Sequence, residues 1–164
     1  MKRVAEETGA ILVDVDRDKT LEVEVPDPLI LDKISVSRSF YEADVRVNAP
    51  VMKTHDRLIV TLGMNNMKGI IQKPTKRLFH RTGLAKAVVD LSKAVPLNLT
   101  VVDAIHAMEG LGPSLGNVFE MDLIMASTDV YSLGVVGARV MGIDPMELEY
   151  MKYAVEQGLV RLDG

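Results

Sequence analysis

TGLAKAVVDLSKAVPLNLTVVDAI (residues 82–105) predicts a helix followed by a buried strand. Apolar side chains of its first part fall on one stripe at helical spacing: Leu84, Val88, Leu91 and Val95. Thr82 is suited to cap the start of this helix, and Pro96 ends it. The run 98–105 is short and mostly apolar, which is typical of a buried strand. A helix passing directly into such a strand indicates an α/β fold.

Outward from this stretch, strands and helices continue to alternate. Apolar or alternating runs predict strands over 10–15, 20–25, 33–39, 44–51 and 122–127. Further helices are predicted over 1–8, 128–142 and 144–158. Segment 56–68 fits either a helix or a strand passing into a helix, and 70–77 predicts a basic loop. We therefore predict a single α/β domain over 1–164, with a mixed, largely parallel central sheet flanked by helices.

Composition narrows the classes of protein to consider. The 164 residues carry a formal net charge of -4, which disfavours nucleic acid as a partner. Cysteine is absent, so the chain alone holds no disulfide, thiolate zinc site or iron–sulfur cluster, and we predict no cofactor in this chain. No apolar stretch approaches the roughly 20 residues that span a bilayer. The expectation is a soluble, cytoplasmic protein without a membrane partner.

Polar clusters follow three of the predicted strands. Lys53-Thr54-His55 comes after 44–51, a loop beginning at Asp103 comes after 98–105, and Ser127-Thr128-Asp129 comes after 122–127. In open α/β sheets, ligands bind beyond the carboxyl ends of the strands. We therefore expect these clusters to meet in one pocket.

Lys53-Thr54-His55 and a further segment, residues 63–69, have the chemistry of an anion site. A cation, a hydroxyl and an imidazole at 53–55 suit an anionic ligand or proton transfer, although a solvated polar loop would look the same. In GMNNMKG (63–69), paired asparagines between glycines can donate N–H groups to a phosphate or carboxylate. A helix C-terminus would also explain that segment. The basic residues of 73–81 that follow suit either a lid or a solvated loop.

The other two clusters are more ambiguous. Asp103, His106 and Glu109 stand three residues apart and could present metal ligands, but one histidine with two carboxylates is a weak pattern, and we predict no metal. The glycines of 110–116 resemble a dinucleotide loop only superficially, because Pro113 removes an N–H donor. Ser127-Thr128-Asp129 is typical of a helix N-cap, which also attracts anions.

Five blocks in this order resemble the family called domain of unknown function 362. They are VNAPVMKTH (47–55), TLGMNNMKG (61–69), VVDAIHAMEGLGP (101–113), ASTD (126–129) and MGIDP (141–145). The resemblance covers roughly 44–160. It implies a redox-associated context, because members of that family are often fused to, or encoded as, proteins with ferredoxin-type 4Fe–4S modules.

This chain departs from the family pattern at three places. Asn65 stands where the family usually has a lysine, Val130 replaces a proline, and Gly134 replaces an aspartate. The resemblance further implies that N-terminal strands are missing, so that residues 1–30 would be the tail of that part. An exposed sheet edge would then be available for pairing with another chain.

Two functional hypotheses remain open. In the first, the chain is an enzyme or a redox-accessory domain. A polar site at the strand ends then binds or polarises an anionic or carbonyl-bearing ligand. Its catalytic candidates are Lys53, His55 and Asp103. Its ligand-binding candidates are Thr54, Asn66, Gly69, Glu109, Gly112, Ser127 and Asp129. In the second, the chain is a non-catalytic interaction or oligomerisation module. The expected partners are a small anionic ligand, a ferredoxin-type protein or a second copy of the chain.

Overall fold

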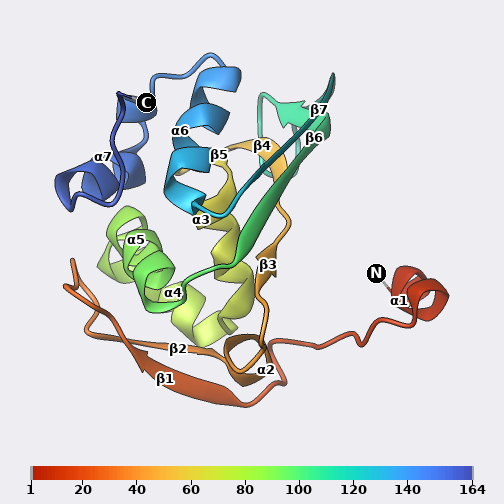
Figure 1. Ribbon diagram of the computed structural model, residues 1–164, viewed down its shortest axis with the longest axis vertical. Helices are drawn as coiled ribbons and strands as arrows, with labels where there is room; N and C mark the ends of the chain where they lie inside the picture. The colour runs from red at the N-terminus through yellow and green to blue at the C-terminus, as the bar shows by residue number, and fades with distance from the viewer. Residues whose placement is uncertain (1, 164) are drawn as a thin grey trace.

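The computed structural model describes residues 2–163 (Figure 1). Its helices are α1 (Lys2–Thr8), α2 (Arg38–Tyr41), α3 (Gly63–Asn66), α4 (Lys73–Thr82), α5 (Leu84–Ala94), α6 (Val130–Val140) and α7 (Glu149–Glu156), with 3₁₀ turns η1 (Met67–Ile70) and η2 (Pro145–Glu147). Its strands are β1 (Thr20–Glu24), β2 (Lys33–Ser37), β3 (Val47–Asn48), β4 (Val51–His55), β5 (Ile59–Thr61), β6 (Leu99–Glu109) and β7 (Asn117–Ser127).

A mixed, five-stranded sheet organises the fold, with β6 at its centre. Strands β3 and β4 pair with β6 in parallel, and β7 pairs with its other edge in antiparallel fashion. Strand β5 returns antiparallel to β4. Three of the five strands therefore run in one direction, and helices flank the sheet, which confirms the predicted α/β class with a mixed, mostly parallel sheet.

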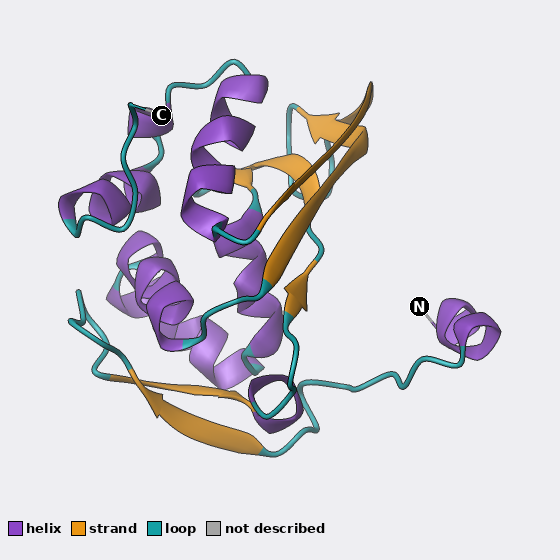
Figure 2. Ribbon diagram, in the orientation of Figure 1, coloured by secondary structure: helices purple, strands orange, loops and turns teal. Residues whose placement is uncertain are grey.

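Helices pack on one face of this sheet (Figure 2). The inward side chains of β6, such as Val102 and Ala104, are fully buried against apolar residues of α5, α6 and α7. A separate two-stranded ribbon, β1–β2, packs its valines and Ile34 against Phe79 of α4. Helix α5 contributes to both apolar clusters, which explains why the helix predicted from its apolar stripe is buried around most of its surface.

The opposite face of the sheet carries exposed apolar side chains. Val47 of β3 and Val51 of β4 are 48% and 44% exposed. Ile124 of β7 pairs with Asp103, which in turn pairs with Val51, so these residues share one face. Within the described residues, no helix of the main body covers this face (Figure 2).

Several predicted elements are wrong in kind or extent. Residues 10–14 form no strand but an extended arm, and Ile11 is 91% exposed. Because a strand needs a neighbour to satisfy its backbone groups, apolar sequence alone does not make one. The predicted strand 44–51 is two short strands, β3 and β4, interrupted at Ala49-Pro50, since proline lacks the N–H that a ladder uses.

Two segments interpreted as loops are regular elements. Residues 70–77 contain the start of α4, because proline is tolerated in the first turn of a helix, where its missing N–H would have no partner. Residues 103–109 continue β6, and β7 begins at Asn117, so the two strands form a long hairpin around residues 110–116. In the ambiguous segment 56–68, β5 passes into α3.

Candidate functional site

A cavity of about 340 Å³ lies where the β4–β5 hairpin, α3, η1 and α4 meet. We call it the lysine cavity. Its lining residues are Lys53, His55, Thr61, Asn65, Asn66, Lys68, Gly69, Lys76, His80 and Pro113. Four residues predicted for the site are among them: Lys53, His55, Asn66 and Gly69.

The strand pair places the first wall of the lysine cavity. Lys53 and His55 are two residues apart on β4 and therefore project to the same side. Thr61 is the cross-strand partner of Lys53 and shares that side. The turn after β4 is fixed by His55 itself, because its Nδ1 accepts hydrogen bonds from the backbone N–H groups of Arg57 (3.1 Å) and Leu58 (3.2 Å).

A network of asparagines builds the second wall. The Nδ2 of Asn66 donates to Oδ1 of Asn48 at 2.8 Å, and the Nδ2 of Asn48 donates to the Gly63 carbonyl at 2.9 Å. The Nδ2 of Asn65 donates to Oγ1 of Thr61 at 3.2 Å. Gly63 is needed here, since a Cβ at this position would lie 2.6 Å from Val130 of α6.

The third wall is basic and comes from η1 and α4. Lys76 and His80 are four residues apart on α4, so they project from the same face of the helix. Lys68 belongs to η1 and is partly buried. Sequence analysis missed Lys76 and His80, because residues 70–77 were interpreted as a loop. Reading this segment as a helix would have placed the two residues on one face, four positions apart.

The electrostatics of the lysine cavity favour anions. Its lining residues include three lysines and no carboxylate. Burial, together with the cation of Lys68, lowers the pKa of both His55 and His80 below 6.5. Both imidazoles are therefore neutral at pH 7 and able to donate or accept hydrogen bonds. Burial also lowers the pKa of Lys68 below its usual 10.5.

Thr54, Glu109 and Gly112 lie at a different place. Thr54 projects to the other side of β4, where its Oγ1 donates to the Gly110 carbonyl (3.0 Å) and accepts from the N–H of Gly112 (3.2 Å). A Cβ at Gly112 would lie 2.1 Å from the Thr54 carbonyl oxygen, so the hairpin loop packs tightly on β4. Thr54 and Glu109 line a second, mostly apolar cavity of about 490 Å³ with Met52 and Phe119.

Asp103, Ser127 and Asp129 do not line the lysine cavity. Asp103 is exposed in the middle of β6, and its Oδ1 accepts from the N–H of Ile105. Ser127 and Asp129 form the N-cap of α6, where Asp129 accepts from the N–H of Tyr131 at 2.9 Å. The expectation of one shared pocket is therefore wrong, although the functional roles predicted for these residues stay predictions.

The direction of the strands explains this separation. Strand β6 continues six residues past Asp103, so that carboxylate is not at a strand end. Strand β7 is antiparallel to β6, and Ser127 pairs with Thr100 near the amino end of β6. The carboxyl end of β7 therefore lies at the amino ends of the parallel strands. The lysine cavity lies at the other end of the sheet, beside the carboxyl end of β4.

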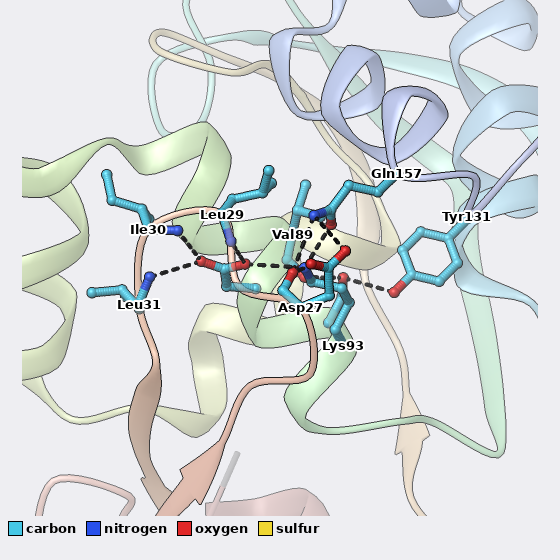
Figure 3. Close-up of polar contacts among 10 residues, drawn as sticks. Asp27, Leu29, Ile30, Leu31, Val89, Lys93, Tyr131 and Gln157 are labelled. Carbon is cyan, nitrogen blue, oxygen red and sulfur yellow. Dashed lines mark hydrogen bonds and ion pairs between the residues drawn. The ribbon is translucent and has the colours of Figure 1, made fainter.

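A third cavity of about 480 Å³ lies beside the start of α6 and is lined by Asp129, Tyr131, Ser92 and Lys93. Lys93, Tyr131 and Gln157 of its lining take part in the polar contacts that Figure 3 draws. The fully buried carboxylate of Asp90 accepts hydrogen bonds from three backbone N–H groups, at residues 29, 30 and 31, and lies 3.3 Å from Nζ of Lys93. Lys93 also donates to Gln157 of the segment after α7.

Neither a metal centre nor a membrane-spanning helix is found among residues 2–163. Among residues 2–163, no three histidine or carboxylate side chains group as metal ligands, and Asp103, His106 and Glu109 form no such set. In the same part of the chain, no helix has the length and apolar character needed to cross a bilayer.

Comparisons with known proteins place the chain in a family. A model of the family described as domain of unknown function (DUF362) matches residues 1–139. The match therefore includes residues 1–43, which the resemblance did not cover, and stops before α7. The chain is also 30% identical over 132 residues to the thylakoid-associated protein sll1697 of Synechocystis sp.. That alignment covers 77% of this chain and 41% of the relative. No solved structure matches. This chain belongs to the DUF362 family.

Proposed function

We propose that the chain binds a small oxyanion, such as a phosphate or carboxylate compound, in the lysine cavity. One observation carries the proposal: Lys53, Lys68 and Lys76, from three separate elements, converge on one cavity whose lining includes no carboxylate. Like charges placed together destabilise a protein unless an anion compensates them. The Asp56 carboxylate, 3.1 Å from Nδ1 of His55, compensates part of this charge, and a ligand of opposite charge accounts for the rest.

Each lining group has a role in this proposal. The lysines supply charge. His55 supplies an Nε2–H donor, because its Nδ1 accepts from the backbone, and the neutral imidazole of His80 can donate a hydrogen bond or accept a proton from a bound ligand. The carbonyl of a ligand held against Lys53 would be polarised by that cation. This arrangement supports proton transfer on a carbonyl-bearing anion, with Lys53 as electrostatic stabiliser, His55 as an Nε2–H donor and His80 as the base.

Calorimetric titration with phosphate, sulfate and simple carboxylates tests the proposal. We expect saturable binding that weakens with added salt. Lys76→Gln removes one charge-assisted hydrogen bond, which is worth about 1.5–3 kcal/mol, so affinity should fall at least about tenfold. Lys152→Gln, at an exposed position of α7, is the matched control and should bind as the wild type does. Absence of binding by every anion would refute the proposal.

The wider context that we propose is redox-associated and cytoplasmic. The family resemblance supports a ferredoxin-type partner. This chain contains no cysteine, so it does not fit a 4Fe–4S cluster of its own, and any such cluster would belong to that partner. We expect an immobilised bacterial ferredoxin to retain the chain. The same ferredoxin, stripped of its cluster and unfolded, should not retain it.

The unpaired edge of β7, together with the exposed apolar face of the sheet, favours a second candidate function, self-association. Strand β7 is an edge strand of eleven residues, and its outer edge is unpaired within the described chain. Antiparallel pairing of β7 with β7 of a second copy would give a two-fold symmetric dimer and bring apolar side chains such as Ile124 together. Light scattering at several concentrations tests this idea: a monomer at every concentration would refute it.

A further inference from the structure

We infer that the ligand of the lysine cavity is a small phosphate monoester that carries a hydroxyl group next to the phosphate. This inference rests on the proposed function and specifies its substrate class. The inference depends on the side chain of Asn65, whose unpaired amide oxygen is not explained by the charge of the cavity.

Asn65 is buried in the lining of the lysine cavity with one polar atom unsatisfied. Its residue is only 3% exposed. The Nδ2 donates to Oγ1 of Thr61, but Oδ1 has no hydrogen-bond partner within the described chain. Buried amide groups are nearly always paired, because leaving one unpaired forfeits its hydrogen bonds to water. A polar group of a bound ligand is a natural partner for this atom.

The chemistry of that ligand group follows from the amide. The oxygen and nitrogen of an asparagine are assigned from the surrounding hydrogen bonds, and Thr61 can either accept or donate. In the orientation of the structure, Nδ2 of Asn65 faces Thr61 and Oδ1 is left without a partner, and a flipped amide would exchange the positions of the two atoms. A hydroxyl group satisfies either remaining atom, since it both donates and accepts.

The charge of the cavity indicates the other half of the ligand. Three lysines without a lining carboxylate fit a dianion better than a single carboxylate. A phosphate monoester carries between one and a half and two negative charges at pH 7 and has three acceptor oxygens. One oxygen can then face each of Lys53, Lys68 and Lys76.

The size of the cavity limits the rest of the ligand. About 340 Å³ lies at the small end of the range of roughly 300–1,000 Å³ for ligand sites. A phosphate and a short hydroxylated carbon chain suit this volume, and Asn65 comes three residues before Lys68 along the chain that lines it. The group that meets the hydroxyl and one of the three lysines that meet the phosphate therefore belong to one continuous segment.

The test compares four probes in calorimetric titrations: inorganic phosphate, methyl phosphate, glycerol 3-phosphate and glycerate. We expect glycerol 3-phosphate to bind at least about tenfold more tightly than methyl phosphate. Methyl phosphate has no hydroxyl, so its complex leaves the buried Asn65 amide without a partner and loses that binding free energy. Asn65→Leu, which keeps the volume, should bring those two ligands to the same affinity. Lys152→Gln should preserve the difference.

A second readout keeps the inference testable if Asn65→Leu does not fold. In wild-type protein, the side-chain amide resonances of Asn65 should shift more with glycerol 3-phosphate than with methyl phosphate. Equal affinities and equal shifts for these two probes would overturn the hydroxyl inference while leaving the proposed anion site intact. Tighter binding of glycerate would overturn the phosphate assignment. Binding of none of the four would refute the proposed function itself.

Discussion

At the scale of single residues, the Asp90 side chain joins the segment before β2 to helix α5. It is fully buried, holds the backbone N–H groups of residues 29–31, and pairs with Lys93 (Figure 3). Asp90→Ala leaves those donors and the ammonium without their partner, and breaking a buried pair costs about 3–5 kcal/mol. Chemical denaturation should show a loss of that size. Asp44→Ala, at an exposed site, should change the free energy of unfolding by less than about 0.5 kcal/mol.

The histidines of the lysine cavity predict how anion binding depends on pH. The pKa of His55 and that of His80 are both lowered below 6.5 by burial and nearby cations. Both rings are therefore neutral at pH 7 and gain their charge only as the pH falls below 6.5. Because each proton adds positive charge beside the anion, affinity should rise on acidification. Sulfate is the suitable probe, since its charge stays constant over this range.

A double variant provides the control for this pH dependence. In His55→Gln, His80→Gln protein, the affinity for sulfate should stay nearly flat between pH 7 and pH 5. A wild-type affinity that is constant over the same range would contradict the placement of these imidazoles beside the bound anion.

At the scale of elements, the segment from Gly63 to Gly69 offers a matched pair of substitutions. In Gly63→Ala, the new Cβ would lie 2.6 Å from Val130, so α3 and α6 must separate, at a cost of about 1–3 kcal/mol. In Gly69→Ala, the new Cβ meets nothing within 4 Å. Thermal unfolding should therefore show a clear decrease in Tm for the first variant and almost none for the second. Equal values would contradict the close packing of α3 on α6.

The same elements show what the sequence could reveal. The β6 strand and α5 were predictable because apolar residues at strand and helix spacing need no knowledge of their neighbours. The β6–β7 hairpin was missed because both strands carry polar residues on an exposed face, for example His106 and Glu120, which pair with each other. Lys53, His55 and Asn66 were placed together correctly, whereas Asp103 and Asp129 were not, because strand direction and strand length are set by pairing.

At the scale of the whole molecule, the N-terminal arm is separate from the packed body (Figure 1). The arm comprises α1, a turn at Gly9 and the extended residues 10–14, and none of the residues of α1 is buried. Its attachment begins further along, where Gln72 donates to the carbonyls of Val15 and Asp18, and Lys73 pairs with Asp16 at 3.2 Å. We therefore expect the free energy of unfolding of the body to be independent of residues 2–13.

Removal of the arm tests this division of the molecule. A chain that lacks residues 2–13 should unfold at the same denaturant concentration as the full chain, within about 0.5 kcal/mol, because it loses no contact with either apolar cluster. Limited proteolysis of the full chain should cut first within residues 9–14, whose backbone is exposed. If the deletion lowers stability by several kcal/mol, the apolar side chains of Ile11 and Leu12 are packed in solution. The exposed face of the sheet would then be the surface to examine, since it is the apolar area that the body leaves uncovered.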